Sequence, residues 1–300
     1  MTKPVPRSVQ EYLDQLRAEL AGADPALIQD ALYDAEEYLR GELHQHPEKT
    51  EEQVLAAIAT TYGAPEEVAE AYRATEVKVQ MALRTPRPKK RASALGKFFS
   101  VYSDPRTYTA MLYMLLALIT GIFYFVWTVT GLSMSIGFMV LIIGIPFFLL
   151  YLGSIRLLSL VEGRIVEALL GVRMPRRPVH PSSSDPRPIM QRIGDVLTDP
   201  RTWSTMLYML LKLPLGVIYF TLVVTFVSAS LGLIVSPIEF FLPNYLWISW
   251  GDDQQYVLPW IFTPLFTLIG VFLLTGFMHM ARGIGYLHGH LAKNLLVKAG

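Results

Sequence analysis

The chain of 300 residues contains no cysteine. This absence excludes disulfide bonds, thiol nucleophiles and thiolate metal sites, and it is typical of soluble parts that face a reducing compartment. The N-terminal residues lack the apolar core of a signal peptide. The sequence also has no glycine-rich phosphate loop, no nucleophile elbow and no His-Glu-x-x-His motif. We therefore expect no enzymatic activity, no cofactor and no metal site.

Charged residues are almost missing from four long runs and are divided unevenly elsewhere. The overall net charge is +1, but residues 1–80 carry 7 Lys/Arg and 16 Asp/Glu, which gives −9 there and +10 in the remainder. A membrane-spanning helix needs roughly 20 apolar residues. The four runs meet this requirement: 108–130, 132–154, 206–231 and 257–280. The pattern predicts an all-α protein with an acidic helical domain followed by a helical membrane domain.

Capping signals divide the first 80 residues into short amphipathic helices. Ser8 and Thr50 each precede a Glu or Gln by three residues, a spacing typical of a capping box. Asp24 precedes Pro25, as at the N-cap and first position of a helix. Gly63 is placed to end a third helix, and Pro65 to open a fourth. These signals predict a small cytoplasmic bundle with an acidic surface that could receive a basic partner.

Loop charges predict the orientation of the spans. The two connections expected outside contain no Lys or Arg, whereas the linker 81–100, the connection 156–201 and the C-terminal residues are basic. Basic loops face the cytoplasm. Both termini are therefore expected in the cytoplasm, with the spans in the inner membrane. We interpret the basic linker as a lipid-facing juxtamembrane cluster and expect no nucleic-acid binding.

The membrane domain contains an internal repeat. Residues 104–116 match residues 199–211 at an offset of 95, and Met111–Leu116 is identical to Met206–Leu211. After the hairpin turn the offset becomes 126, so that Arg156 matches Arg282. Each half begins and ends inside, which makes the repeats parallel and relates them by an axis along the membrane normal. The predicted domains are 1–80, the linker 81–100, repeat 1 at 101–178, a cytoplasmic linker at 179–197 and repeat 2 at 198–300.

Each hairpin continues into an amphipathic helix. One apolar stripe contains Leu158, Val161, Ile165 and Leu169, and its counterpart Ile284, Leu287, Leu291 and Leu295. The stripes either lie on the bilayer surface or pack on each other. Lys212 lies a few residues inside span three, where we expect its ammonium group to reach the interface. As coupling residues near the inner ends of the spans, we single out Asp104, Arg106, Arg156, Asp199, Arg201 and Arg282.

The long outer connection of the second hairpin is the candidate sensing segment. It combines aromatic rings with carboxylates that could receive a lipid, a cationic peptide or a cation. Tryptophan and tyrosine also form ordinary interfacial belts, so ligand contact and belt remain alternatives. The residues concerned are Glu239, Tyr245, Trp247, Trp250, Asp252 and Asp253.

The two parts of the chain resemble known domain families. Residues 98–298 resemble the sensor domain family of bacterial and archaeal membrane proteins, on the evidence of Asp199–Trp203, Leu211–Gly216, Gly144–Pro146, Ala168–Val172 and Ala281–Gly283. Residues 8–80 resemble the small helical domain found beside such sensors, through Tyr12-Leu13, Leu16, Asp34, Glu37 and Tyr62–Ala69. Family members often precede a histidine kinase. No kinase motif is present before Gly300, so we expect a signal to pass to another protein or through the N-terminal helices.

These observations favour a membrane sensor that relays an envelope or membrane state to a cytoplasmic signalling or regulatory protein. The sensor contacts the bilayer, and both a monomer and a homo-oligomer fit the sequence. A small transporter or transporter subunit is the alternative, because parallel repeats also occur in transporters. A membrane scaffold that holds its partner without sensing is the third hypothesis.

Overall fold

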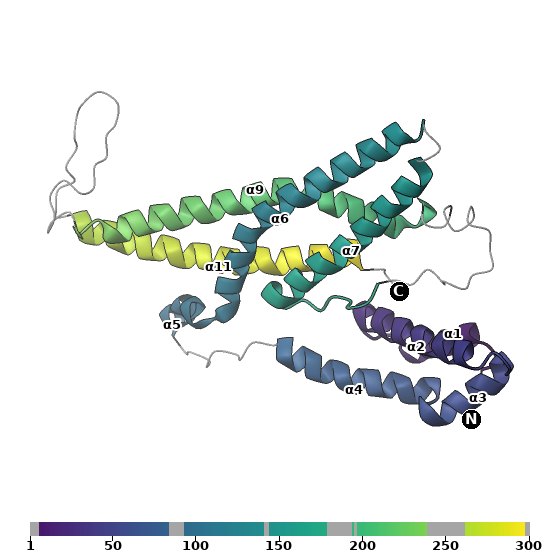
Figure 1. Ribbon diagram of the computed structural model, residues 1–300. Helices are drawn as coiled ribbons and strands as arrows, with labels where there is room; N and C mark the ends of the chain where they lie inside the picture. The colour runs from purple at the N-terminus through teal and green to yellow at the C-terminus, as the bar shows by residue number, and fades with distance from the viewer. Residues whose placement is uncertain are drawn as a thin grey trace. The chain divides into compact units, whose positions relative to one another are not determined.

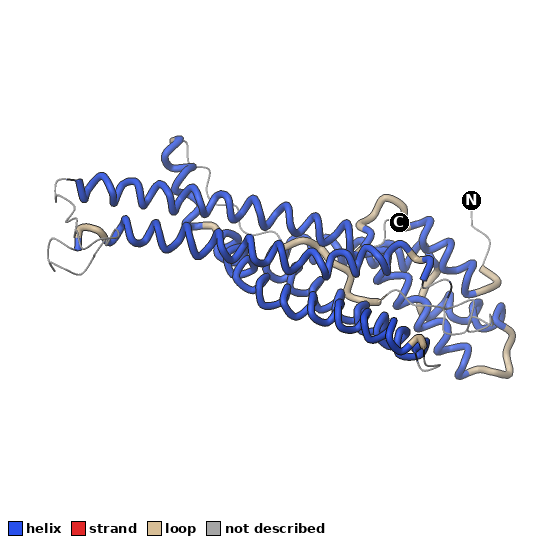
Figure 2. The backbone as a smooth tube through the Cα atoms, turned by 90° about the horizontal axis from the view of Figure 1, so that it is seen from above, coloured by secondary structure: helices blue, strands red, loops and turns tan. Residues whose placement is uncertain are grey.

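The computed structural model describes residues 6–83, 93–140, 144–178, 194, 197–238 and 262–297. These residues form helices and the loops that join them, with no strand among them (Figure 2). The all-α prediction is confirmed. Figure 1 labels most of the helices, whose bounds are α1 Val9–Glu19, α2 Pro25–Gln45, α3 Glu51–Thr61, α4 Pro65–Leu83, α5 Ala94–Phe98, η1 Phe99–Ser103, α6 Pro105–Phe138, α7 Gly144–Leu170, α9 Pro200–Val235 and α11 Thr263–Leu296.

The chain divides into two compact units, and three of the helices contribute residues to both units. Unit 1 contains Met1–Arg84, Trp127–Tyr208 and Gly289–Gly300, and unit 2 contains Thr85–Val126 and Met209–His288. Unit 1 thus holds α1 to α4, all of α7 and the ends of α6, α9 and α11. Unit 2 holds α5, η1 and the remaining lengths of α6, α9 and α11.

The helices α1 to α4, here called the N-terminal domain, begin and end where the capping signals predict. The Ser8 hydroxyl accepts the amide of Glu11, and the Asp24 carboxylate accepts that of Ala26. At Thr50 both halves of the capping box form. Gly63 has φ of +107°, a left-handed conformation that favours glycine and stops α3. Only half of the box at Ser8 forms, because Glu11 accepts the amide of Arg7 instead.

The N-terminal domain has an apolar core of its own. In α1, the side chains of Tyr12, Leu13 and Leu16 face α2 and α4. Ala31 and Leu39 of α2 are fully buried in the same core. The Tyr12 hydroxyl donates to the carbonyl of Gly63 at 2.8 Å, which ties α1 to the turn before α4. Burial raises the pKa of Tyr12 and keeps its hydroxyl a donor.

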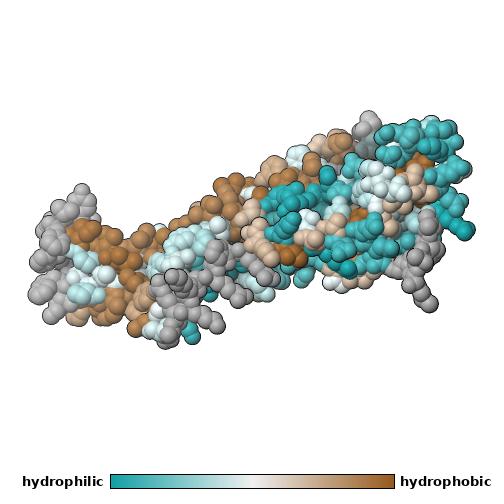
Figure 3. Space-filling view, turned by 90° about the horizontal axis from the view of Figure 1, so that it is seen from below, coloured by the Kyte–Doolittle hydropathy of each residue, from teal (hydrophilic) through white to brown (hydrophobic). Residues whose placement is uncertain are grey.

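Four helices are long and apolar enough to cross a membrane: α6, α7, α9 and α11. They contain 34, 27, 36 and 34 residues. At a rise of about 1.5 Å per residue they run from about 40 to 54 Å, more than the roughly 30 Å hydrocarbon core. Figure 3 shows mostly hydrophobic residues over the long helices and hydrophilic ones over the N-terminal domain. The four-span prediction is confirmed.

The first hairpin turns later than the sequence suggests. We expected span one to end near residue 130, but α6 continues to Phe138. Gly131 serves close packing instead of a turn, because a Cβ placed there would lie 2.3 Å from the Tyr151 ring of α7. Gly131 therefore marks where two helices approach each other.

The predicted amphipathic helices are continuous with spans two and four. No break separates them from α7 or α11. Their apolar stripes are not the buried faces: Val161 is 47% exposed and Leu287 69% exposed. The buried face lies on the other side and carries Glu162 and Gly163 in α7, and His288 and Gly289 in α11. The exposed stripes favour the lipid-facing alternative.

Candidate functional site

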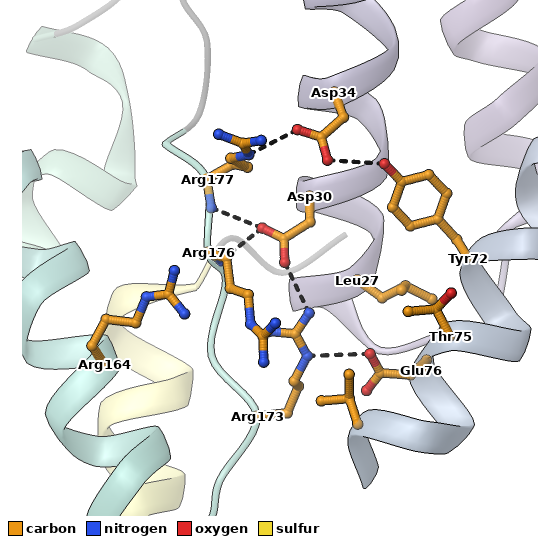
Figure 4. Close-up of a pocket in the computed structure, with 11 residues that line it drawn as sticks. Leu27, Asp30, Asp34, Tyr72, Thr75, Glu76, Arg164, Arg173, Arg176 and Arg177 are labelled. Carbon is orange, nitrogen blue, oxygen red and sulfur yellow. Dashed lines mark hydrogen bonds and ion pairs between the residues drawn. The ribbon is translucent and has the colours of Figure 1, made fainter. Parts of the chain in front are cut away.

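The segment that follows α7, residues 171–178, is here called the clamp segment. Gly171 takes φ of +69° and ends α7 by turning the backbone into a left-handed conformation. Its amide still bonds to the carbonyl of Glu167 at 3.1 Å. Residues 171–178 form no helix, and they pass along α2 and α4 of the N-terminal domain (Figure 4).

Arg173 is the centre of a buried ion cluster between the clamp segment and the N-terminal domain (Figure 4). Its guanidinium lies 2.9 Å from Asp30 of α2 and 3.2 Å from Glu76 of α4. A third carboxylate, Glu167 of α7, lies at 3.7 Å. All four side chains are only 8% exposed. One arginine thus contacts a carboxylate from each of three helices.

Burial by itself lowers the pKa of Arg173, but the facing carboxylates of Asp30 and Glu76 together raise it above its ordinary value. The guanidinium therefore stays charged. Removing it would leave several carboxylates buried without their cation, which typically weakens a structure by about 3–5 kcal/mol. Arg173 is the residue on which this contact most depends.

Asp30 also binds the backbone of the clamp segment. Its Oδ1 accepts the amide of Arg176 at 2.7 Å and that of Arg177 at 2.8 Å, while Oδ2 takes the Arg173 side chain. Burial raises the pKa of Asp30, and the two amides and the Arg173 charge only partly offset this effect. Asp30 therefore binds both the backbone and a side chain of the clamp segment.

Two further arginines complete the rim of the cluster. Arg177 Nε lies 2.8 Å from Asp34, which also accepts the Tyr72 hydroxyl at 2.9 Å. Burial, and then the bond to Asp34, raise the pKa of Tyr72, so its hydroxyl remains a donor. Arg176 turns back to Glu167 of α7 at 2.9 Å.

A cavity of about 320 Å³ lies among these groups (Figure 4). Asp30, Asp34 and Glu76, here called the acidic face, line it on the N-terminal domain, and the arginines line it on α7 and the clamp segment. The full lining is Leu27, Asp30, Asp34, Tyr72, Thr75, Glu76, Val79, Arg164, Arg173, Arg176 and Arg177.

The end of repeat 2 also contacts the N-terminal domain, through fewer groups. Lys293 of α11 lies 2.5 Å from Asp24 at the start of α2. Arg201 of α9 donates to the side chain of Gln29 at 3.1 Å, and Gln29 donates to the carbonyl of Arg177 at 2.5 Å. The two repeat 2 contacts are thus made at Asp24, the N-cap of α2, and at Gln29, near the N-terminal end of that helix.

Four of the six predicted coupling residues form ion pairs that cross between the repeats. Asp104 of repeat 1 lies 3.2 Å from Arg282 of repeat 2, within unit 2. Asp199 of repeat 2 lies 3.9 Å from Arg156 of repeat 1, within unit 1. Because the offsets match Asp104 with Asp199 and Arg156 with Arg282, the two pairs are equivalent under the repeat.

The remaining two coupling residues, Arg106 and Arg201, both donate a backbone amide to a helix cap. Asp104 accepts the amide of Arg106, and Asp199 that of Arg201, each at 3.0 Å. These bonds cap α6 and α9 in the same way. The coupling role of the six residues remains a prediction.

Within unit 2, α6 and α9 cross symmetrically. A Cβ on Gly121 would lie 2.7 Å from the carbonyl oxygen of Lys212, and one on Gly216 would lie 2.4 Å from that of Ala117. The offset of 95 matches Gly121 with Gly216 and Ala117 with Lys212. Each glycine thus lets its helix approach the equivalent carbonyl of the other repeat.

Several ionisable side chains are buried inside the spans. Lys212 is fully buried, so our expectation that its ammonium group reaches the interface is wrong. The group donates to the Tyr113 hydroxyl and lies 4.3 Å from the centre of that ring. The ring of His288 also packs on Tyr113, and His288 Nδ1 lies 3.1 Å from the Tyr219 hydroxyl. An aromatic hydroxyl and ring thus take the place of water around the lysine.

The equivalent position in unit 1 is acidic. Glu162, which matches His288 at the offset of 126, is fully buried and accepts the Tyr208 hydroxyl at 2.9 Å. Tyr208 itself matches Tyr113. The sequence analysis missed Glu162 and the clamp residues. The signal available in the sequence was the presence of two carboxylates, Glu162 and Glu167, in a mostly apolar helix.

The predicted sensing residues, Glu239, Tyr245, Trp247, Trp250, Asp252 and Asp253, lie outside the described residues. Their role remains a prediction. Within the described ranges, no group of three or more His, Asp or Glu side chains is arranged to hold a metal ion.

Comparison with known proteins places both parts of the chain. No curated protein and no solved structure matches it. The family model described as HAAS matches residues 11–71, which form most of the N-terminal domain. The model described as Putative sensor matches residues 113–296, more than half of the chain and nearly all of the spanning helices. The chain therefore belongs to the Putative sensor family, with a HAAS domain at its N-terminus.

Proposed function

We propose that the chain is a multi-pass membrane sensor without a catalytic output, which relays an envelope or membrane state to a cytoplasmic signalling protein. In this proposal it lies in the inner membrane with both termini in the cytoplasm. The carrying observation is the Arg173 cluster. It ties Glu167 at the end of spanning helix α7 to Asp30 and Glu76 in the HAAS-matched domain.

The mechanism follows from the position of Arg173, three residues beyond the end of α7. A rotation or tilt of α7 displaces the guanidinium from its carboxylates. Interfaces of this kind respond in steps, because a buried charge cluster is either closed or broken. The N-terminal domain is then held in one state and released in the other.

The relay can be measured as a distance, since a chain without cysteine accepts two labels cleanly. Ala56 of α3 and Ala168 of α7 are both exposed. Spin labels on Ala56→Cys and Ala168→Cys, in the full chain in vesicles, report the separation of the N-terminal domain from α7. We expect a shift or broadening when bilayer thickness, anionic lipid content or tension changes. A distance that stays fixed under all three treatments contradicts the relay.

The outer connection is tested separately. Replacing Trp247, Trp250, Asp252 and Asp253 together should abolish the distance change while the protein remains in the membrane. An unchanged response assigns sensing to the spans themselves.

The output is tested by crosslinking in native membranes with the full chain and with a chain that lacks residues 1–80. Capture of a kinase or transcription regulator only by the full chain supports the relay. Capture of transport subunits by both the full and the shortened chain favours the transporter hypothesis.

A further inference from the structure

The acidic face recognises both the backbone and the arginine side chains of its occupant. Asp30 accepts two consecutive backbone amides, those of Arg176 and Arg177, at 2.7 and 2.8 Å. Consecutive amides point to opposite sides of an extended strand, so a single oxygen that accepts both recognises a bent backbone, and residues 176 and 177 form a bend. The same carboxylate also holds a guanidinium, which adds a requirement for arginine.

The spacing of the arginines defines the rest of the recognition. Arg173 meets Asp30 and Glu76, and Arg177 meets Asp34. The Arg176 side chain points away to Glu167 of α7. The acidic face therefore selects two arginines four positions apart on a segment that bends at the second of them.

We propose that the acidic face is a binding site for a bent, arginine-bearing segment of a partner protein, and that the clamp segment is its intramolecular occupant. Identification of this partner with the output protein rests on the proposed function. The binding chemistry does not, because it follows from the groups that hold residues 173–177.

The clamp segment and a partner segment compete for the acidic face. A segment tethered close to its site acts at an effective concentration in the millimolar range. A partner segment of similar affinity cannot displace it at ordinary cellular concentrations. Displacement of the clamp segment by α7 removes this competitor and opens the acidic face.

The test uses the full chain in lipid nanodiscs and a fluorescent peptide with the sequence of residues 171–178. Wild-type protein should bind the peptide weakly. Arg173→Ala weakens the clamp segment, and we expect it to bind the peptide at least about tenfold more tightly. Adding Asp30→Asn to that variant should lower the affinity again by about tenfold. The matched control is a peptide with glutamine at the positions of Arg173 and Arg177, which should not bind.

Two results would overturn the inference. One is equal affinity of wild type and Arg173→Ala, and the other is equal binding of the arginine and glutamine peptides. Limited proteolysis of the N-terminal domain checks that it stays folded. If Arg173→Ala fails this check, Arg177→Gln removes the contacts with Asp34 and with the Tyr33 ring, and it should give a smaller gain in peptide affinity.

The labels on Ala56 and Ala168 separate this inference from the relay. If the peptide binds but the label distance does not respond to the bilayer, the binding site stands and the relay is wrong. A responsive distance without peptide binding retains the relay and rejects the site.

Discussion

Repeat 1 and repeat 2 have the same plan but meet the N-terminal domain in different ways. Repeat 1 ends in Arg173 and two further arginines, which contact four carboxylates. The end of repeat 2 supplies Lys293, paired with Asp24. Glu167 and Lys293 occupy equivalent positions at the offset of 126, with opposite charge. The two repeats thus share a plan, but the N-terminal domain makes most of its ionic contacts with repeat 1.

The largest expected difference between the repeats is in this attachment. Arg173→Ala should lower the free energy of unfolding by about 3–5 kcal/mol, because buried carboxylates lose their cation. Lys293→Ala should lower it by about 1 kcal/mol or less, since that pair is partly exposed. Thermal unfolding in detergent, with proteolysis of the N-terminal domain, measures both. Equal effects would mean that both repeats hold the domain to the same degree.

The next difference concerns the equivalent tyrosines Tyr113 and Tyr208. Tyr208 donates to buried Glu162, whereas Tyr113 accepts from buried Lys212. Hydrogen bonds to charged groups contribute about 1.5–3 kcal/mol. Tyr208→Phe and Tyr113→Phe should each lower stability by that amount in thermal unfolding. A buried variant that unfolds like the wild type would show that its hydrogen bond adds nothing to stability.

The helix crossing should show no difference between the repeats. Gly121→Ala and Gly216→Ala each place a methyl group against a backbone carbonyl, at 2.7 and 2.4 Å. Each should lower stability by about 1–3 kcal/mol through overpacking. Gly153→Ala meets nothing within 4 Å and should stay within about 0.5 kcal/mol of wild type. A large effect at only one of these two glycines would show that the equivalent contacts do not contribute equally to stability.

The smallest effects are expected at the crossed ion pairs. The Arg156–Asp199 pair is 36% and 30% exposed, and the Arg282–Asp104 pair is 46% and 12% exposed. Pairs with this much solvent contact contribute about 0.2–1 kcal/mol. Arg156→Gln and Arg282→Gln should therefore unfold close to wild type, with Arg282→Gln the larger effect because its contact is shorter. An effect above 2 kcal/mol would assign these pairs a structural role beyond their charge.

Local signals in the sequence predicted much of the fold. Side-chain caps and Gly63 fixed the helices of the N-terminal domain, because capping depends on neighbours three residues away. Hydropathy predicted the four spans, and the matching segments predicted the repeat. The turn after α6 was misplaced because two consecutive apolar spans show no change in hydropathy where one helix ends and the next begins.

The candidate site could not be predicted in the same way. Asp30 and Arg173 are 143 positions apart, and each resembles an ordinary solvated charge in its own segment. Lys212 was misjudged for a related reason: its burial depends on Tyr113, which lies on another helix. Charged groups reveal their partners only through the tertiary fold.

The continuity of α7 has a mechanical consequence. This helix has no break over 27 residues, so it is a rod of about 40 Å with Arg173 just beyond one end. A tilt of about 10° about its far end, well within the range seen for membrane helices, moves the near end by about 7 Å. The contacts of Arg173 with Asp30 and Glu76 span 2.9 and 3.2 Å. In the proposed relay, α7 is a lever that converts a small tilt at one end into a movement larger than an ionic contact at the other.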